Sequence, residues 1–165
     1  MLDTLPDYAE LHALSNFSFL RGASHAKELV QTAAQLGYTA LAITDECTMS
    51  GVVRAYEAVQ KSDHALQLII GTELTTTDGL KLVLLCTSHT GYTQLCRLIT
   101  RGRRAAPKGQ YQLTRDDLLE ILASPAHSDP AVLVLWSPTH DNIASGHWLK
   151  QHFGGRCWLA VSLLF

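Results

Sequence analysis

The chain has 165 residues, of which 47% are hydrophobic and 17% charged. That length suffices for one domain with a buried core, and the composition favours a buried sheet over a disordered or coiled chain. A net charge of −2 excludes a uniformly basic nucleic-acid binder, and no apolar run reaches the roughly 18 residues that a membrane span requires.

Strand-like and helix-like segments alternate along the chain. Ser24 is a candidate N-cap for the first helix, which ends before Gly37. A hairpin is predicted at 77–79, where Thr-Asp-Gly separates two apolar runs. Thr114 and Asp117 resemble a capping box at the start of a short helix. The predicted strands are 8–14, 40–44, 66–74, 80–86, 131–136 and 158–164, and the predicted helices are 25–36, 51–61, 90–102, 114–123 and 143–152.

This alternation predicts an α/β fold with a mostly parallel sheet. The sequence at 18–23 lacks the glycine-rich turn of a Rossmann fold, and GxxxxGK[ST] is absent, so nucleotide-phosphate binding is disfavoured. The last segment reads as a buried strand, and domains rarely stop in one, so a fragment of a longer protein is expected. Four cysteines without CxxC spacing indicate buried reduced thiols of a cytoplasmic protein: Cys47, Cys86, Cys96 and Cys157.

Three predicted strands end in side chains that can bind a metal. His12 ends the first, Asp45 and Glu46 follow the second, and Glu73 ends the third. The ends of successive strands in a β/α barrel gather on one face, and two carboxylates with an imidazole suit Zn²⁺, Mn²⁺ or Fe. Structural alternatives exist for each: His12 as a packing residue, Asp45-Glu46 as caps of the following helix, and Glu73 as the partner of an arginine. The other histidines show no ligand spacing.

Four longer motifs stand out along the chain: Leu-His-x-x-Ser-x-Phe-Ser at 11–18, Leu-Gly-Tyr-x-Ala-Leu-Ala-Ile-Thr-Asp at 36–45, Ile-Ile-Gly-x-Glu at 69–73 and Gly-Tyr-x-x-Leu-x-x-Leu-Ile-Thr at 91–100. These motifs resemble the polymerase-and-histidinol-phosphatase (PHP) domain, which opens the bacterial C-family DNA polymerases. The resemblance runs over about residues 7–164, and three segments are similar to the error-prone, damage-inducible branch of these polymerases: 15–24, 44–47 and 103–109.

The resemblance implies a distorted β/α barrel of the PHP type, incomplete after about six strands, with residues 1–165 forming an N-terminal PHP fragment. The metal pattern of the family is only partly kept. Leu14 stands at the second histidine of His-x-His, Arg21 at the acid of an Asp-Gly pair, and Glu46 at the histidine of Thr-Asp-His. The glutamate of Gly-x-Glu is retained as Glu73, and the ligands of later motifs would lie beyond Phe165.

Two expectations follow for this degenerate site. We expect no multi-metal cluster, and at most one weakly held Zn²⁺ or Mn²⁺ near His12, Glu46 and Glu73. We also expect Arg21, as a permanent cation, to replace the metal in a buried pair with Glu46 or Glu73. Removing one partner of such a buried pair would cost about 3–5 kcal/mol.

A basic segment covers the end of the third predicted helix and the residues after it, and precedes Tyr111. Three interpretations stay open: contact with nucleic acid through phosphate neutralisation, a solvated helix end, and docking on the rest of the polymerase. The cations are Arg97, Arg101, Arg103, Arg104 and Lys108.

The function that the resemblance implies is that of a scaffold module in an error-prone DNA-directed DNA polymerase, a nucleotidyltransferase of translesion synthesis and damage-induced mutagenesis. The parent would use Mg²⁺ held by carboxylates outside this chain, so the fragment alone is expected to be inactive. Expected partners are the remainder of the polymerase chain, DNA through the parent, other translesion-synthesis proteins and the sliding clamp, but no membrane. The alternatives are a stand-alone metal-dependent PHP phosphoesterase and a pure protein-interaction module.

Overall fold

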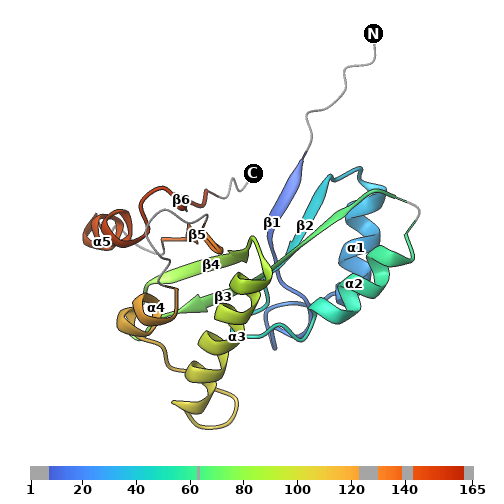
Figure 1. Cartoon of the computed structure of the whole chain (residues 1–165). Helices are drawn as coiled ribbons and strands as arrows, with labels where there is room; N and C mark the ends of the chain where they lie inside the picture. The colour runs from blue at the N-terminus through green and yellow to red at the C-terminus, as the bar shows by residue number, and fades with distance from the viewer. Residues whose placement is uncertain (1–7, 63, 123–129, 139–142, 162–165) are drawn as a thin grey trace. The chain divides into compact units, whose positions relative to one another are not determined.

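The computed structural model describes residues 8–62, 64–122, 130–138 and 143–161 (Figure 1). Two compact units make up the fold, residues 1–70 and 71–165, and strand β3 (Gln67–Thr75) runs from the first into the second. None of the helices within the described ranges combines the length and the apolar character that crossing a membrane requires.

The first unit is a parallel β/α arrangement. Strand β1 (Ala9–Ala13) pairs in parallel with β2 (Ala40–Ile43), and β2 pairs in parallel with the first half of β3. Helices α1 (Ala26–Gln35) and α2 (Val52–Gln60) lie side by side against these strands, as Figure 1 shows. Small side chains let the helices approach closely, and the shared core consists of Ala26, Val30, Ala33, Ala34, Leu41, Ile43, Ala55, Ala58 and Leu66.

The N-terminus of α1 differs by one residue from the sequence prediction. His25, not Ser24, is the N-cap, and its backbone N–H donates to Glu28 Oε2 at 2.8 Å. This contact is the carboxylate half of a capping box, in which an acid in the first turn binds the backbone just before the helix. The predicted box at α4 (Arg115–Leu122) is confirmed, because the Thr114 N–H donates to Asp117 Oδ2 at 2.8 Å and the Asp117 N–H donates to Thr114 Oγ1 at 3.3 Å.

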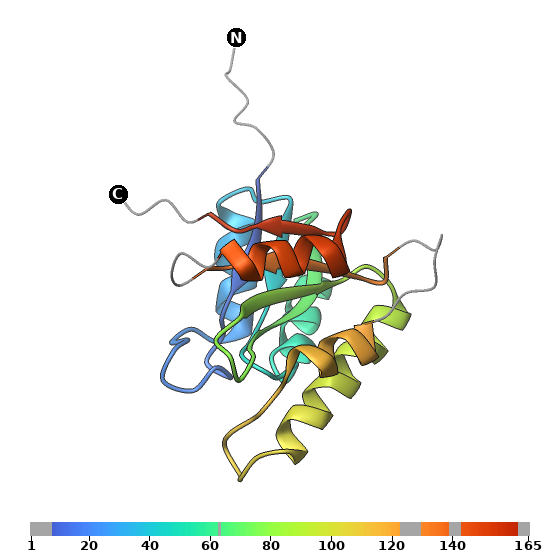
Figure 2. The same ribbon diagram turned by 90° about the vertical axis from the view of Figure 1, so that its left-hand side faces the viewer.

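The second unit combines antiparallel and parallel pairing. The second half of β3 and β4 (Lys81–Cys86) form the predicted hairpin, β4 pairs antiparallel with β5 (Val132–Trp136), and β5 pairs in parallel with β6 (Cys157–Leu159). Helix α3 (His89–Arg104) packs on β4 and α4, and Figure 2 shows α3 and α4 side by side. Helix α5 (Ile143–Phe153) contacts β6.

One sequence prediction is confirmed here and another needs correction. Three of the five strand pairings are parallel, so the mostly parallel sheet is confirmed, and the antiparallel pairings are β3–β4 and β4–β5. Helices α3 and α4 return the chain to the end of β4 that it left, so Val132 pairs opposite Cys86 and β5 runs antiparallel to β4. The last strand, predicted over 158–164 as buried, is β6, in which Trp158 and Leu159 are 50% and 56% exposed. Their exposure follows from the place of β6 at the end of the strand order, beside β5. Residues 162–165 lie outside the described residues.

Candidate functional site

Asp45 is the centre of a buried polar cluster in the first unit. It follows β2, is 1% exposed, and receives three hydrogen bonds of 2.7 Å: from the Ser15 N–H to Oδ1, from Ser15 Oγ to Oδ2, and from Ser18 Oγ to Oδ1. Ser18 Oγ in turn accepts the Glu46 N–H at 2.9 Å. Charged acceptors bind hydroxyl and amide donors more strongly than neutral ones do. The carboxylate of Asp45 therefore fixes the loop that follows β1.

Two glycines make room for this cluster. A Cβ on Gly51 would lie 2.5 Å from Asp45 Oδ2, and a Cβ on Gly22 would lie 2.0 Å from the carbonyl oxygen of Ser15. Neither separation is sterically allowed, so both positions require glycine for close approach. Gly51 is also the N-cap of α2 and offers no side-chain hydrogen bond, so the capping of this helix by Asp45-Glu46 is not what the structure shows.

Arg21 contacts Glu46 beside the cluster. Its Nη1 lies 2.8 Å from Glu46 Oε2, so the predicted pairing of these two residues is confirmed. The predicted burial is wrong, because the two side chains are 34% and 31% exposed. Water therefore screens the pair, and its contribution belongs with surface ion pairs, at about 1 kcal/mol or less, and not with the 3–5 kcal/mol of a buried pair.

Glu73 pairs with a lysine, not with an arginine, which was the structural alternative to a metal-binding role. It lies in the second unit on β3, its side chain is 1% exposed, and Oε2 lies 3.1 Å from Nζ of Lys81 on the neighbouring strand β4. A buried carboxylate needs such a counter-charge, because leaving it unpaired costs several kcal/mol. Glu73 thus stabilises the β3–β4 hairpin.

His12 is the penultimate residue of β1, close to the strand end where it was expected, and is partly buried. Its backbone N–H donates to Glu10 Oε1 at 2.8 Å. The other oxygen of Glu10 accepts the Tyr8 hydroxyl at 3.0 Å. Across the described ranges, no three His, Cys, Asp or Glu side chains lie close enough together to hold a metal ion.

The donor set does not fit a metal of the family type. Both oxygens of Asp45 accept hydrogen bonds from serines, Glu46 contacts a guanidinium, and Glu73 contacts an ammonium. Each of the three predicted carboxylate ligands therefore has a partner that competes with a cation. Ser15 and Ser18 bind Asp45 but are not part of the family's metal pattern. Ser15 nevertheless stands within Leu-His-x-x-Ser, one of the motifs that carry the resemblance.

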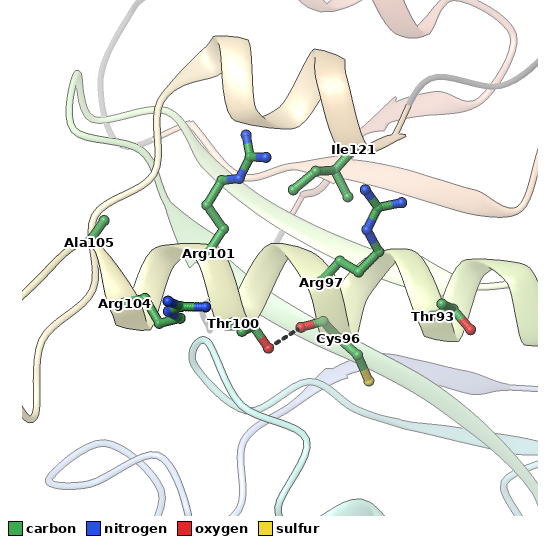
Figure 3. Close-up of a pocket in the computed structure, with 8 residues that line it drawn as sticks. All are labelled: Thr93, Cys96, Arg97, Thr100, Arg101, Arg104, Ala105 and Ile121. Carbon is green, nitrogen blue, oxygen red and sulfur yellow. Dashed lines mark hydrogen bonds between the residues drawn. The ribbon is translucent and has the colours of Figure 1, made fainter.

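A second candidate site is a groove along α3 in the second unit (Figure 3), with a volume of about 690 Å³. Arg97 and Arg101 point towards the side of Ile121 on α4, and the hydroxyl of Thr100 donates to the carbonyl oxygen of Cys96 at 2.8 Å. The groove is lined by Thr93, Cys96, Arg97, Thr100, Arg101, Arg104, Ala105 and Ile121.

Two of the five predicted nucleic-acid contacts have roles within the fold. Arg101 forms a fork with Glu120 at 2.5 and 2.7 Å and also reaches Asp117 at 3.1 Å, which joins α3 to α4. Arg103 packs over the Tyr111 ring, 5.4 Å from its centroid. The other three cations are exposed: Arg97, Arg104 and Lys108.

The Arg101 fork shifts the pKa values of its members. Hydrogen bonds from Arg101 hold the pKa of Glu120 below its ordinary value, and those from Glu120 and Asp117 raise the pKa of Arg101. Burial opposes the shift of Asp117, but hydrogen bonds from Thr114 and Arg101 outweigh it and lower the pKa of that carboxyl.

The prediction of buried thiols is correct for Cys47, whereas Cys86, Cys96 and Cys157 are only partly buried. At the end of β4, burial and then the charge of Cys96 raise the pKa of Cys86 to about 12, so this thiol stays protonated.

Comparison with known proteins agrees with this architecture. The PHP domain family matches residues 10–154. Curated proteins named error-prone DNA polymerase from Dechloromonas aromatica and Pseudomonas fluorescens are 54% and 55% identical over 97% and 94% of this chain, which spans only 15% and 14% of their length. The crystal structure of a candidate metal-dependent phosphoesterase from Bifidobacterium adolescentis superposes with a TM-score of 0.59 at 15% identity, over 94% of this chain and 77% of that one.

The chain therefore belongs to the PHP domain family. The expected fold class, an incomplete distorted β/α barrel of the PHP type, is confirmed by the family match and by the similarity in fold to the phosphoesterase structure.

Proposed function

We propose that the chain is the N-terminal PHP domain of an error-prone DNA-directed DNA polymerase and serves there as a scaffold module. The observation that carries the proposal is the identity of more than half of the aligned residues with two curated polymerases of that name, over nearly the whole chain. Mg²⁺-dependent nucleotidyl transfer, translesion synthesis in the cytoplasm, and contacts with the sliding clamp or other translesion proteins would belong to the whole polymerase.

The scaffold role rests on the chemistry of the polar cluster. A metal-dependent phosphoesterase uses its cation to activate water and stabilise charge, and its carboxylates must be available to that cation. Here Asp45 binds serines and Glu46 binds Arg21. We propose that Arg21 and the serines do structurally what metal ions do in other members of the family, so that any Zn²⁺ or Mn²⁺ bound by the chain is at most a single weakly held ion.

The test is a chimeric polymerase. The segment of the Dechloromonas aromatica protein that matches this chain is replaced by the chain itself, and primer extension is measured on intact and abasic templates. We expect the chimera to extend primers on both templates and a variant with the segment deleted to lose activity. An inactive chimera would contradict the proposal. Metal-dependent phosphoester hydrolysis by the chain alone, abolished by His12→Ala, would favour the stand-alone phosphoesterase.

We further propose that the exposed part of the basic segment contacts the DNA backbone in the polymerase. Arg97 and Arg104 lie seven residues apart on α3, about 10 Å along its axis, and both line the groove. These two arginines and Lys108 are exposed, so they can neutralise phosphates at this surface without disturbing the Arg101 fork.

A further inference from the structure

The loop after β1 exposes two large apolar side chains on a rigid backbone. Phe19 is 83% exposed and Leu20 90%, the highest values among the large hydrophobic residues of the described chain. Single exposed apolar residues are common on protein surfaces. Two adjacent ones at the tip of a loop are unusual when the loop is held as firmly as this one.

Hydrogen bonds fix the backbone on both sides of the tip. The Asn16 N–H donates to the Ser24 carbonyl at 2.8 Å and closes the loop, and the N–H groups of Arg21 and Gly22 donate to the Ser18 carbonyl at 3.0 and 2.9 Å. Ser18 Oγ binds Asp45, and Arg21 binds Glu46. Phe19 and Leu20 therefore cannot fold back into the core without breaking the polar cluster.

Leu20 also has an unfavourable backbone conformation, with φ at +60°. This left-handed region costs a residue with a Cβ about 1 kcal/mol or more, which glycine would avoid. A leucine at this position thus carries both a conformational cost and the cost of apolar exposure. Both costs are offset if the side chain is buried by a partner, as in the aromatic and aliphatic anchors of protein interfaces.

We infer that Phe19 and Leu20 form an anchor that inserts into an apolar pocket on the part of the polymerase that follows the PHP domain. The chain spans about 15% of the curated polymerases that it matches, so most of such a protein lies outside it and is covalently attached nearby. That attachment gives the anchor a high effective concentration, so a small apolar contact suffices for docking. The inference rests on the proposed function and names the surface through which the scaffold acts.

Hydroxyl-radical labelling read by mass spectrometry tests the anchor in the isolated chain and in the chimeric polymerase. In the isolated chain we expect strong labelling of Phe19 and Leu20. In the chimera we expect their labelling to fall to the level of Phe153, which is 2% exposed. Leu36, which is 63% exposed at the end of α1, is the matched control and should be labelled equally in both proteins.

A double variant supplies the second readout. Phe19→Ser with Leu20→Ser should leave the melting temperature of the isolated chain unchanged or raised, yet lower that of the chimera and shorten the lifetime of its primer-extension activity on heating. Leu36→Ser should do neither. Labelling of Phe19 in the chimera at the level of the isolated chain would overturn the inference while the chimera's activity upholds the proposed function. Protection that depends on the concentration of the isolated chain would also overturn it, because the occupant would then be a second copy.

Discussion

Replacing Asp45 by alanine is the most direct test of how the loop after β1 is held. The substitution removes one carboxylate and leaves three donors without their acceptor: the N–H and hydroxyl of Ser15 and the hydroxyl of Ser18. Ser15 and Ser18 are 0% and 2% exposed, so water does not reach these groups in the folded chain. An unsatisfied buried donor costs about 1–3 kcal/mol.

Three such donors, with partial relief from water entering the space that the carboxylate leaves, predict a loss of about 3–5 kcal/mol in the free energy of unfolding. This is a large fraction of the about 5–15 kcal/mol that stabilises a typical domain. Asp45→Asn should cost less, because an amide oxygen still accepts from Ser15 or Ser18. Glu57→Ala removes an exposed carboxylate on α2 whose contact with Arg54 is 3.6 Å long, and it should change the free energy by less than about 0.5 kcal/mol.

Urea unfolding followed by circular dichroism measures these three differences, and hydrogen exchange of the amides at 16–22 locates them. The alanine variant should show faster exchange throughout the loop before global unfolding, since the N–H groups of the loop lose their fixed geometry. An Asp45→Ala variant within 1 kcal/mol of the parent, with unchanged exchange at 16–22, would refute the assignment of Asp45 as the anchor of this loop.

Three other expected outcomes follow from contacts described above. Arg21→Ala should lower the free energy of unfolding by about 1 kcal/mol in urea titrations, because its pair with Glu46 is one-third exposed; a loss near 4 kcal/mol would show that the pair is buried in solution. Arg97→Ala combined with Arg104→Ala should reduce the slope of log K for duplex DNA against log salt by about 2, measured by fluorescence anisotropy on the chimera, whereas an unchanged slope would exclude both from phosphate contact. The pKa of Asp117 is lowered in the fold, so its contribution is complete above its ordinary value of 3.8 and is lost as the pH falls through the folded value. Urea midpoints of the parent and Asp117→Asn should accordingly differ at pH 6 and converge towards pH 2, and a constant difference would contradict this.

Short sequence motifs predicted the elements well where the structure depends on residues that are neighbours in the chain. The hairpin follows from Thr-Asp-Gly between two apolar runs, and the start of α4 follows from Thr114 and Asp117. The direction of β5 is not local, because it depends on α3 and α4 packing as an antiparallel pair that returns the chain to the end of β4. Nothing in the apolar run at 131–136 distinguishes a parallel from an antiparallel neighbour.

The candidate site was likewise predictable only in part, because several of its features depend on residues far apart in the sequence. Charge complementarity was enough to predict that Arg21 pairs with Glu46 or Glu73, since an arginine in a ligand position must find a carboxylate, and the structure shows the pair with Glu46. Its exposure was not predictable, because solvent access depends on how the loop lies over β2. The serine donors to Asp45 were missed for a related reason: Ser15 is 30 residues away, and a hydroxyl beside a polar loop gives no sign of its partner.

The nine residues of β3 take part in the strand pairing of both units. Gln67 to Ile70 align with β2 in the first unit, and Gly71 to Thr75 align with β4 in the second. Successive side chains of a strand alternate between the two faces, so a slip of one residue turns every side chain over. In β3 such a slip would expel Glu73 from its buried position beside Lys81 and misalign β2 at the same time. A register shift of β3 itself is therefore penalised by the pairing with β2 and by the pairing with β4.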